Sequence, residues 1–370
     1  MKITKLMLAA CAVVLALVSC NKENTTPELS GNLKSVTLTL DNVSFETKGA
    51  NDFVNPRLDN TEVKLGSIQF FFSDGSSLYI PKNADGSDAK TYFTTAELAA
   101  ADLSFHSLPA SVSEVYAIGN EDEIQVGNND PLSKLHMDLG IGLQQNPDDL
   151  TLYAFSNLVP MAAPAGDHST HVSATKVYSA TLAPAPRVAR FEIDKISCDF
   201  SATPLFNSVE AIKIAFADYY QVSDLFTGTV SGGYSIDASS QNTIFSFLDG
   251  KSKGWDCDLW TTSPALTPSS ESAEVNLAYN FFPPVVSGNL YPRFALRVTT
   301  NNNEGAYVMT VKFKKTDNTE LAVTDFKAGV IYRITDFAFK DTDLTHQERC
   351  VEITVDVIEW SVVPIYPTFN

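Results

Sequence analysis

The chain has 370 residues, of which 11% are aromatic and 19% are charged, and its formal net charge at pH 7 is -18. This length leaves room for two domains of ordinary size. Because nucleic acids and anionic membrane faces repel an acidic surface, the charge argues against both as partners.

The first residues, MKITKLMLAACAVVLALVSC, are typical of an exported lipoprotein. Two lysines precede an apolar run that is too short for a comfortable membrane span, which indicates a secretory signal peptide. Its end, LVSC, fits the bacterial lipobox, in which the signal is cut before the cysteine and the thiol is acylated. We therefore expect residues 1–19 to be the signal and Cys20 to carry lipid. An ordinary signal peptide with a chance cysteine is the alternative.

Residues 21–30 are polar and read as a solvated tether, after which alternating apolar residues predict many short strands. The first has Val36, Leu38 and Leu40 between threonines. Further strands are expected at 63–72, 112–118, 150–155, 172–182, 211–216, 273–279, 293–299, 307–313 and 330–339.

Short strands separated by turn residues favour an all-β fold with two β-sandwiches in tandem. The proline pair in APAP, residues 183–186, predicts the boundary between them. We expect an N-terminal sandwich over 49–185 and a C-terminal sandwich over 186–358. One short helix is expected over Thr94–Leu103, with Thr94 or Thr95 as its cap and Glu97 in its first turn.

The sequence has few candidates for chemistry. Its two histidines at 168 and 171 lie in a loop without a helix to fix their spacing, so a solvated loop is favoured over a metal site. The stretch NADGSD, residues 83–88, lacks the distal glutamate of a calcium loop and favours a turn. Residues 121–123, EDE, favour a solvated loop over an acid/base pair. No nucleophile elbow, phosphate loop or zinc-protease motif is present. We therefore expect no enzymatic activity, no cofactor and no metal.

Two tryptophans, Trp255 and Trp260, flank an Asp-Cys-Asp stretch. Exposed tryptophans can stack on sugars, but packing in the core is the favoured interpretation.

Once Cys11 leaves with the signal and Cys20 is acylated, three cysteines remain: Cys198, Cys257 and Cys350. Their number is odd and their spacing matches no zinc pattern, so disulfides do not organise the fold. One pair with a spare thiol and three buried thiols both remain open, and buried thiols are favoured.

The C-terminal segment EITVDVIEWSVVPIYPTFN predicts a long extended strand with no hairpin partner after it. Its apolar alternation changes phase at Ile358, and two prolines exclude the last residues from the centre of a sheet. The pattern alone does not name the strand that pairs with this segment.

Several segments together resemble the fimbrillin family, the lipoprotein pilins of Bacteroidales that build type V pili. The resemblance covers nearly the whole chain and rests on the order of six segments. They are the lipobox with the NKE after it, LKSVTLTLDNVSFETKGA, LPASVSEVYAIGN, PRVARFEIDKI, FKAGVIYRITDFAF and VEITVDVIEWSVVP.

The resemblance implies two transthyretin-like Greek-key sandwiches, no catalysis, and a lipid-anchored precursor in the cell outer membrane. It also implies proteolytic removal of the first strand, within residues 20–48, and polymerisation with other pilus subunits by strand exchange into an extracellular fimbria that supports adhesion. In that mechanism we expect residues 359–370 to act as the donor strand, with Trp360, Val362, Val363 and Ile365 filling the groove of a neighbouring molecule. The best-known members are cut after arginine, whereas the matching position here is Lys48 and the nearby arginine is Arg57. The cut is expected after Lys48, with Arg57 as the rival site in the same loop.

Three functions remain open from the sequence: a shaft subunit of a pilus, an accessory or tip adhesin of the same pilus, and a surface glycan-binding lipoprotein. In the third, the tail would be the last strand of its own sheet.

Overall fold

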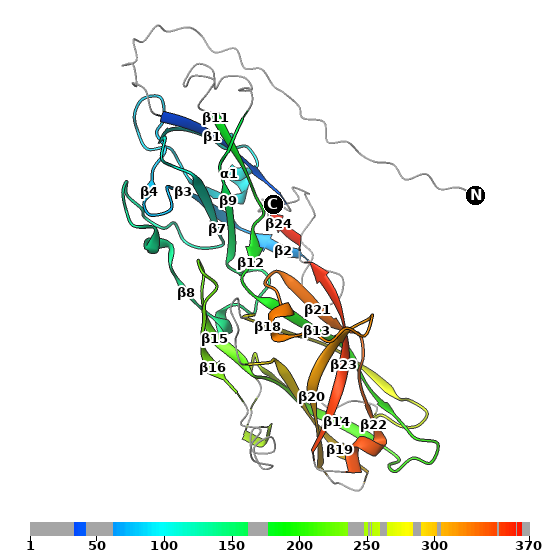
Figure 1. The fold of residues 1–370 in the computed structure, drawn as a ribbon. Helices are drawn as coiled ribbons and strands as arrows, with labels where there is room; N and C mark the ends of the chain where they lie inside the picture. The colour runs from blue at the N-terminus through cyan, green and yellow to red at the C-terminus, as the bar shows by residue number, and fades with distance from the viewer. Residues whose placement is uncertain are drawn as a thin grey trace, which may run out of the picture. The chain divides into compact units, whose positions relative to one another are not determined.

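A computed structural model describes residues 33–41, 62–161, 177–235, 248–250, 252, 254–259, 265–283, 290–301, 305–345, 348–359 and 361–364. These residues form an all-β fold whose strands lie in several sheets (Figure 1).

The first two sheets are built mainly from the N-terminal half. The four-stranded sheet has the order β10 (Val159–Pro160), β11 (Val177–Leu182), β1 (Leu33–Leu40) and β6 (Ser104–Pro109). The other has the order β12 (Ala185–Pro186), β9 (Leu152–Asn157), β7 (Glu114–Gly119), β3 (Ser67–Ser73) and β4 (Leu78–Tyr79), with β5 (Tyr92–Thr94) also paired to β3.

Aromatic side chains join these two sheets into a sandwich. Phe105 of β6 lies with its ring centroid 4.9 Å from that of Phe72 and 5.9 Å from that of Phe70, both on β3. All three rings are buried, as are Val36 and Leu38 of β1. Burying such side chains contributes about 1.5–3 kcal/mol each, so the sheets hold together chiefly through this layer.

The C-terminal half forms a nine-stranded sheet. Its order is β17 (Cys257–Leu259), β14 (Val209–Ala217), β19 (Arg293–Thr300), β20 (Gly305–Lys315), β23 (Glu348–Glu359), β21 (Val330–Ile334), β13 (Ala189–Asp199) and β18 (Ser272–Phe281), with β22 (Phe337–Lys340) on β13. The fully buried ring of Phe191 on β13 packs 5.3 Å from Phe294 on β19 and 4.8 Å from Phe313 on β20. β13 therefore faces β19 and β20 across one aromatic core.

Two small sheets and several short helices complete the described fold. The sheets are β16 (Val230–Tyr234), β15 (Tyr219–Asp224) and β8 (Asp138–Gly140), and the pair β2 (Glu62–Leu65) and β24 (Ser361–Pro364). The helices include α1 (Thr95–Leu98) and the 3-10 turns η1 (Leu132–Leu135), η2 (Ile141–Leu143), η5 (Val323–Asp325) and η6 (Asp341–Thr345).

The expected helix over residues 94–103 is wrong in length, since α1 ends at Leu98. The cap is confirmed: Thr94 is the N-cap, and its backbone N–H donates to Glu97 Oε2 at 2.9 Å. The helix stops because the following residues turn toward β1, where the Leu103 carbonyl accepts from the Leu38 N–H at 2.9 Å. A tertiary strand contact has replaced the last turns of a helix too short to persist alone.

The single strand expected over residues 63–72 is also wrong, because the chain bends at Gly66 into β2 and β3. Asn120, which has a left-handed φ of 62°, holds this corner. Its Oδ1 accepts from the Gly66 N–H at 2.7 Å, while its Nδ2 donates to the Lys64 and Leu150 carbonyls at 2.7 and 2.8 Å. Likewise, residues 330–339 form two strands, β21 and β22.

Several contacts cross the expected boundary at residues 183–186. β8 pairs with β15, and the Gln145 side chain donates to the Asn280 carbonyl at 3.0 Å. The Ala185–Pro186 dipeptide itself pairs with β9. The division into domains at 185/186 stays a prediction.

Candidate assembly site

The strand expected to be removed, β1, lies in the middle of its sheet. It runs parallel to β11 (Figure 1), with the register Ser35 to Val177 through Leu40 to Leu182. On its other side it pairs antiparallel with β6. Its removal would leave two strands with unpaired backbone groups facing a gap, and such edges bind another strand. We call the space that β1 occupies between β6 and β11 the β1 slot.

One face of β1 is apolar and closes the sandwich. Val36 is fully buried and Leu38 is 5% exposed, whereas Thr39 on the other face is exposed. In the register, Val36 lies opposite Phe105 of β6. The alternation expected from the sequence is therefore confirmed for this strand.

The start of β1 is polar and was not anticipated. Lys34 and Ser35 are both buried, and the Lys34 ammonium donates to the carbonyl of Val112. Burial lowers the pKa of Lys34. The sequence does contain a sign of this polar end, because Lys34 alternates in phase with Val36 and Leu38. It therefore faces the same side of the strand as they do.

A hollow lies beside the other end of β1. Leu38, Thr39 and Leu40 line it from β1, and Leu98, Ala99, Ala101 and Leu103 line it from α1 and the segment that follows. Its lining is apolar apart from Thr39.

The tail begins as part of the nine-stranded sheet. β23 pairs in parallel with β20 and antiparallel with β21, where the last pair joins Glu359 to Val330. Ile353 and Val355 are buried, but Val357 is 47% exposed. Burial of this face of β23 thus ends at Val357, one position before Ile358, where the sequence predicted the change of phase. Ile358 itself is half-buried.

Beyond β23 the tail pairs with the N-terminal half of its own chain. β24 runs parallel to β2, with Val362 opposite Val63 and Val363 opposite Lys64 (Figure 1). Val63 and Leu65 of β2 are fully buried. No pattern in the sequence indicates β2 as the partner of the tail.

The other expected site residues lie outside the described residues. These are Cys20, Lys48, Arg57, Trp360 and Ile365, together with the histidines at 168 and 171 and Trp260. The donor-strand role of Trp360, Val362, Val363 and Ile365, the lipid on Cys20 and the two cleavage sites stay predictions.

The remaining candidates from the sequence have structural roles. Residues 83–88 form a turn, in which the Asn83 N–H donates to the Ser87 carbonyl at 2.9 Å. Trp255 is half-buried and its ring packs edge-on against Tyr219 at 4.8 Å. Cys198 and Cys257 are buried, as favoured. Among the described residues, no three His, Cys, Asp or Glu side chains gather to hold a metal ion.

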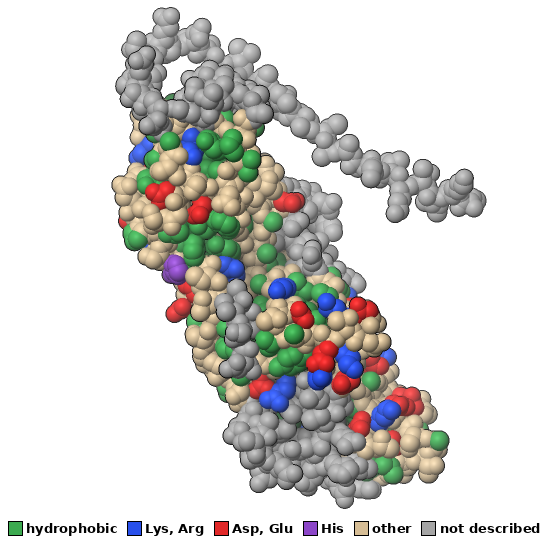
Figure 2. Space-filling model, in the orientation of Figure 1, with side chains coloured by type: hydrophobic (Ala, Val, Ile, Leu, Met, Phe, Trp, Pro, Cys, Tyr) green, Lys and Arg blue, Asp and Glu red, His purple; other side chains and the backbone are tan. Residues whose placement is uncertain are grey.

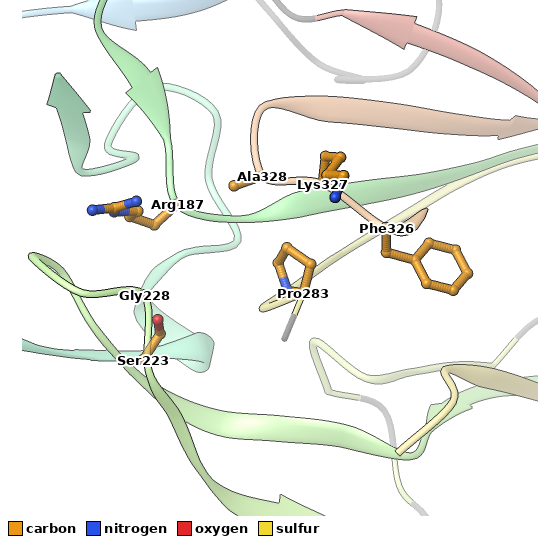
Figure 3. A pocket seen from close by; sticks show the side chains of 7 residues that line it. All are labelled: Arg187, Ser223, Gly228, Pro283, Phe326, Lys327 and Ala328. Carbon is orange, nitrogen blue, oxygen red and sulfur yellow. The ribbon is translucent and has the colours of Figure 1, made fainter. Parts of the chain in front are cut away.

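A small pocket lies in the C-terminal half of the chain (Figure 3). It is lined by Arg187, Ser223, Gly228, Pro283, Phe326, Lys327 and Ala328. The Arg187 guanidinium donates to the carbonyls of Leu225 and Phe226 at 2.5 and 2.6 Å and stacks 3.8 Å from the Tyr153 ring centroid. Because the guanidinium is bound by these two carbonyls and the Tyr153 ring, it joins the turn after β15 to β9 and does not offer an anion site.

The visible surface carries charged side chains of both signs, interspersed with apolar ones (Figure 2). Within the part of the chain that the structure describes, no helix is long and apolar enough to span a bilayer.

No family model and no curated protein sequence matches the chain. Among solved structures, it is similar to a putative cell adhesion protein from Bacteroides eggerthii, with 11% identity and a TM-score of 0.46 over 91% of this chain and 99% of that one. A putative cell adhesion protein from Parabacteroides distasonis has 12% identity and a TM-score of 0.48 over 91% and 98%. A fimbrilin from Porphyromonas gingivalis has 10% identity and a TM-score of 0.47 over 89% and 98%. The last of these carries the name of the family that the sequence resembles.

Proposed function

We propose that the protein is a structural subunit of a cell-surface pilus, exported as a lipoprotein on Cys20 and built from two transthyretin-like Greek-key sandwiches. In this proposal, cleavage after Lys48 or Arg57 frees β1, and the tail of another subunit then enters the β1 slot. The finished fimbria supports adhesion.

The observation that carries the proposal is the central place of β1. A strand at the edge of a sheet could leave without opening the sandwich, but the loss of β1 exposes two strand edges and the apolar layer beneath them. Lys48 and Arg57 follow β1 in the sequence and precede β2, so a cut at either detaches β1 from the rest of the chain.

The tail is the segment that would enter the β1 slot of another subunit. β24 is held to its own chain by a four-residue parallel ladder with β2, and parallel pairing is slightly weaker per residue than antiparallel pairing. Release of these few bonds frees residues 360–370 to reach another subunit. Since the slot and the tail are different surfaces, the contact is head-to-tail and grows a filament.

The test combines limited trypsin treatment of the purified full chain with negative-stain imaging. We expect filaments after the cut and none before it. A variant that lacks residues Glu359–Asn370 should fold, because β23 keeps nearly all of its pairs with β20 and β21, but it should form no filaments. Filaments of normal length from this variant would refute the role of the tail.

The pairing of β24 with β2 favours one alternative, a surface glycan-binding lipoprotein whose tail stays in its own chain. Trypsin-treated protein that remains monomeric while β1 is lost would support this alternative.

A further inference from the structure

The β1 slot has a polar end that recognises particular side chains. Lys34 is 5% exposed, and its ammonium donates to the carbonyl of Val112, a fully buried residue in the turn after β6. The same ammonium lies 4.2 Å from the ring centroid of Tyr178 on β11. A carbonyl and an aromatic face both favour a cation, so the slot offers a site for one basic side chain.

The next position of the slot recognises a hydroxyl group. Ser35 is fully buried, and its Oγ lies 2.8 Å from Nδ1 of His106 on β6. Either atom can donate, depending on which ring nitrogen carries the proton. An apolar side chain here would leave the imidazole nitrogen without this partner.

A β-bulge in β6 builds this end of the slot. Lys34 pairs with Leu108 while Val36 pairs with Phe105, so two residues of β6 face one residue of β1. One of the two is Ser107, which has a left-handed φ of 58°. Such bulges bend a strand and re-aim a side chain, and here the bulge brings the imidazole to the hydroxyl.

The tail lacks the basic side chain that this end of the slot binds. Residues Glu359–Asn370, EWSVVPIYPTFN, contain serine and threonine but no lysine and no arginine. A tail that occupies the slot therefore leaves the Val112 carbonyl without an ammonium donor, which penalises its binding relative to β1.

We propose that Lys34 and Ser35 are the specificity-determining residues of β1, and that the slot prefers a strand with a basic residue followed by a hydroxyl residue. This inference rests on the proposed function, in which a tail replaces β1. Its consequence is that the strand already in place outcompetes the tail, so assembly waits until proteolysis has cut β1 away.

The experiment uses the full chain, nicked with trypsin, treated with a trypsin inhibitor and separated from the released β1 fragment by size-exclusion chromatography. Fluorescent peptides are titrated against it, and their binding is followed by fluorescence polarisation. The reference peptide is LKSVTLTL, residues 33–40. We expect the Lys34→Met peptide to bind about tenfold more weakly, the Ser35→Ala peptide several-fold more weakly, and the Lys34→Arg peptide within about threefold of the reference.

The matched control separates recognition from general attraction to an acidic protein. It combines Lys34→Met with Thr39→Lys, which keeps the net charge but moves the cation to an exposed position of β1. This peptide should bind as weakly as Lys34→Met alone. The unlabelled tail peptide, residues 359–370, should displace the reference peptide only at about tenfold or greater excess.

Equal affinities for the reference, the Lys34→Met peptide and the charge-matched control would overturn the inference and leave strand replacement intact. Binding of the tail peptide as tightly as the reference would overturn it too. If no peptide enters the nicked protein, including the sequence of β1 itself, strand replacement at this slot is refuted, and the specificity proposal is refuted with it.

Discussion

After the chain is cut, β1 should stay bound until its side chains leave the core, and Val36 should control how quickly this happens. Val36 is fully buried opposite Phe105. Val36→Ala removes two methyl-sized groups at about 0.8 kcal/mol each, and a residual cavity brings the loss to roughly 2 kcal/mol. Because 1.4 kcal/mol corresponds to a factor of ten, release of the cut β1 fragment should accelerate about 30-fold.

The assay nicks each protein with trypsin, stops the reaction with inhibitor, and follows the β1 fragment by size-exclusion chromatography and mass spectrometry. Lys34 itself is protected from trypsin in the folded protein by its burial. Thr39→Ala, at an exposed position of the same strand, is the control and should release its fragment at nearly the parental rate. Equal release rates for the Val36 and Thr39 variants would refute the view that the apolar face of β1 seals the sandwich.

Three further predictions concern cleavage, the β2 corner and a buried thiol. Lys48→Ala should slow trypsin-induced assembly and the double variant with Arg57→Ala should abolish it, as measured by light scattering and N-terminal sequencing; unimpaired assembly of the double variant would place the activating cut elsewhere. Asn120→Gly keeps the left-handed backbone but removes three side-chain hydrogen bonds. The free energy of unfolding, measured in urea, should therefore fall by about 2–3 kcal/mol. The control Asn129→Gly, at an exposed position with φ 64°, should change this free energy little. Burial raises the pKa of Cys198 to about 12, so its thiol should resist iodoacetamide at pH 8 in the folded protein and react after denaturation, as peptide mapping would report; labelling in the folded state would contradict its burial.

Local sequence patterns predicted those features that depend on neighbouring residues. The alternation of Val36 and Leu38 places one face of β1 in the core, and the cap at Thr94 follows from its Glu97 partner three residues later. The all-β class follows from many such short patterns taken together.

Features set by distant residues were missed. The bend at Gly66 depends on Asn120, more than fifty residues away, and the end of α1 depends on a hydrogen bond between Leu103 and β1. No periodicity in the tail indicates that β24 pairs with β2, because four-residue parallel pairing has no turn signal to announce it. The polar end of the β1 slot was overlooked because a lysine in a strand is ordinarily read as solvent-facing, whereas Lys34 is held by a carbonyl from the turn after β6.

The two ladders that hold β1 also decide how the sheet responds to mechanical load. A pull along β1 loads the hydrogen bonds to β6 and to β11 together, in shear, while a pull across its end would break them one at a time. Resistance to force is governed by the rate at which a structure comes apart, and rupture in shear requires many bonds to fail at once. Whichever strand lies between β6 and β11 is therefore held most firmly against tension directed along its own axis.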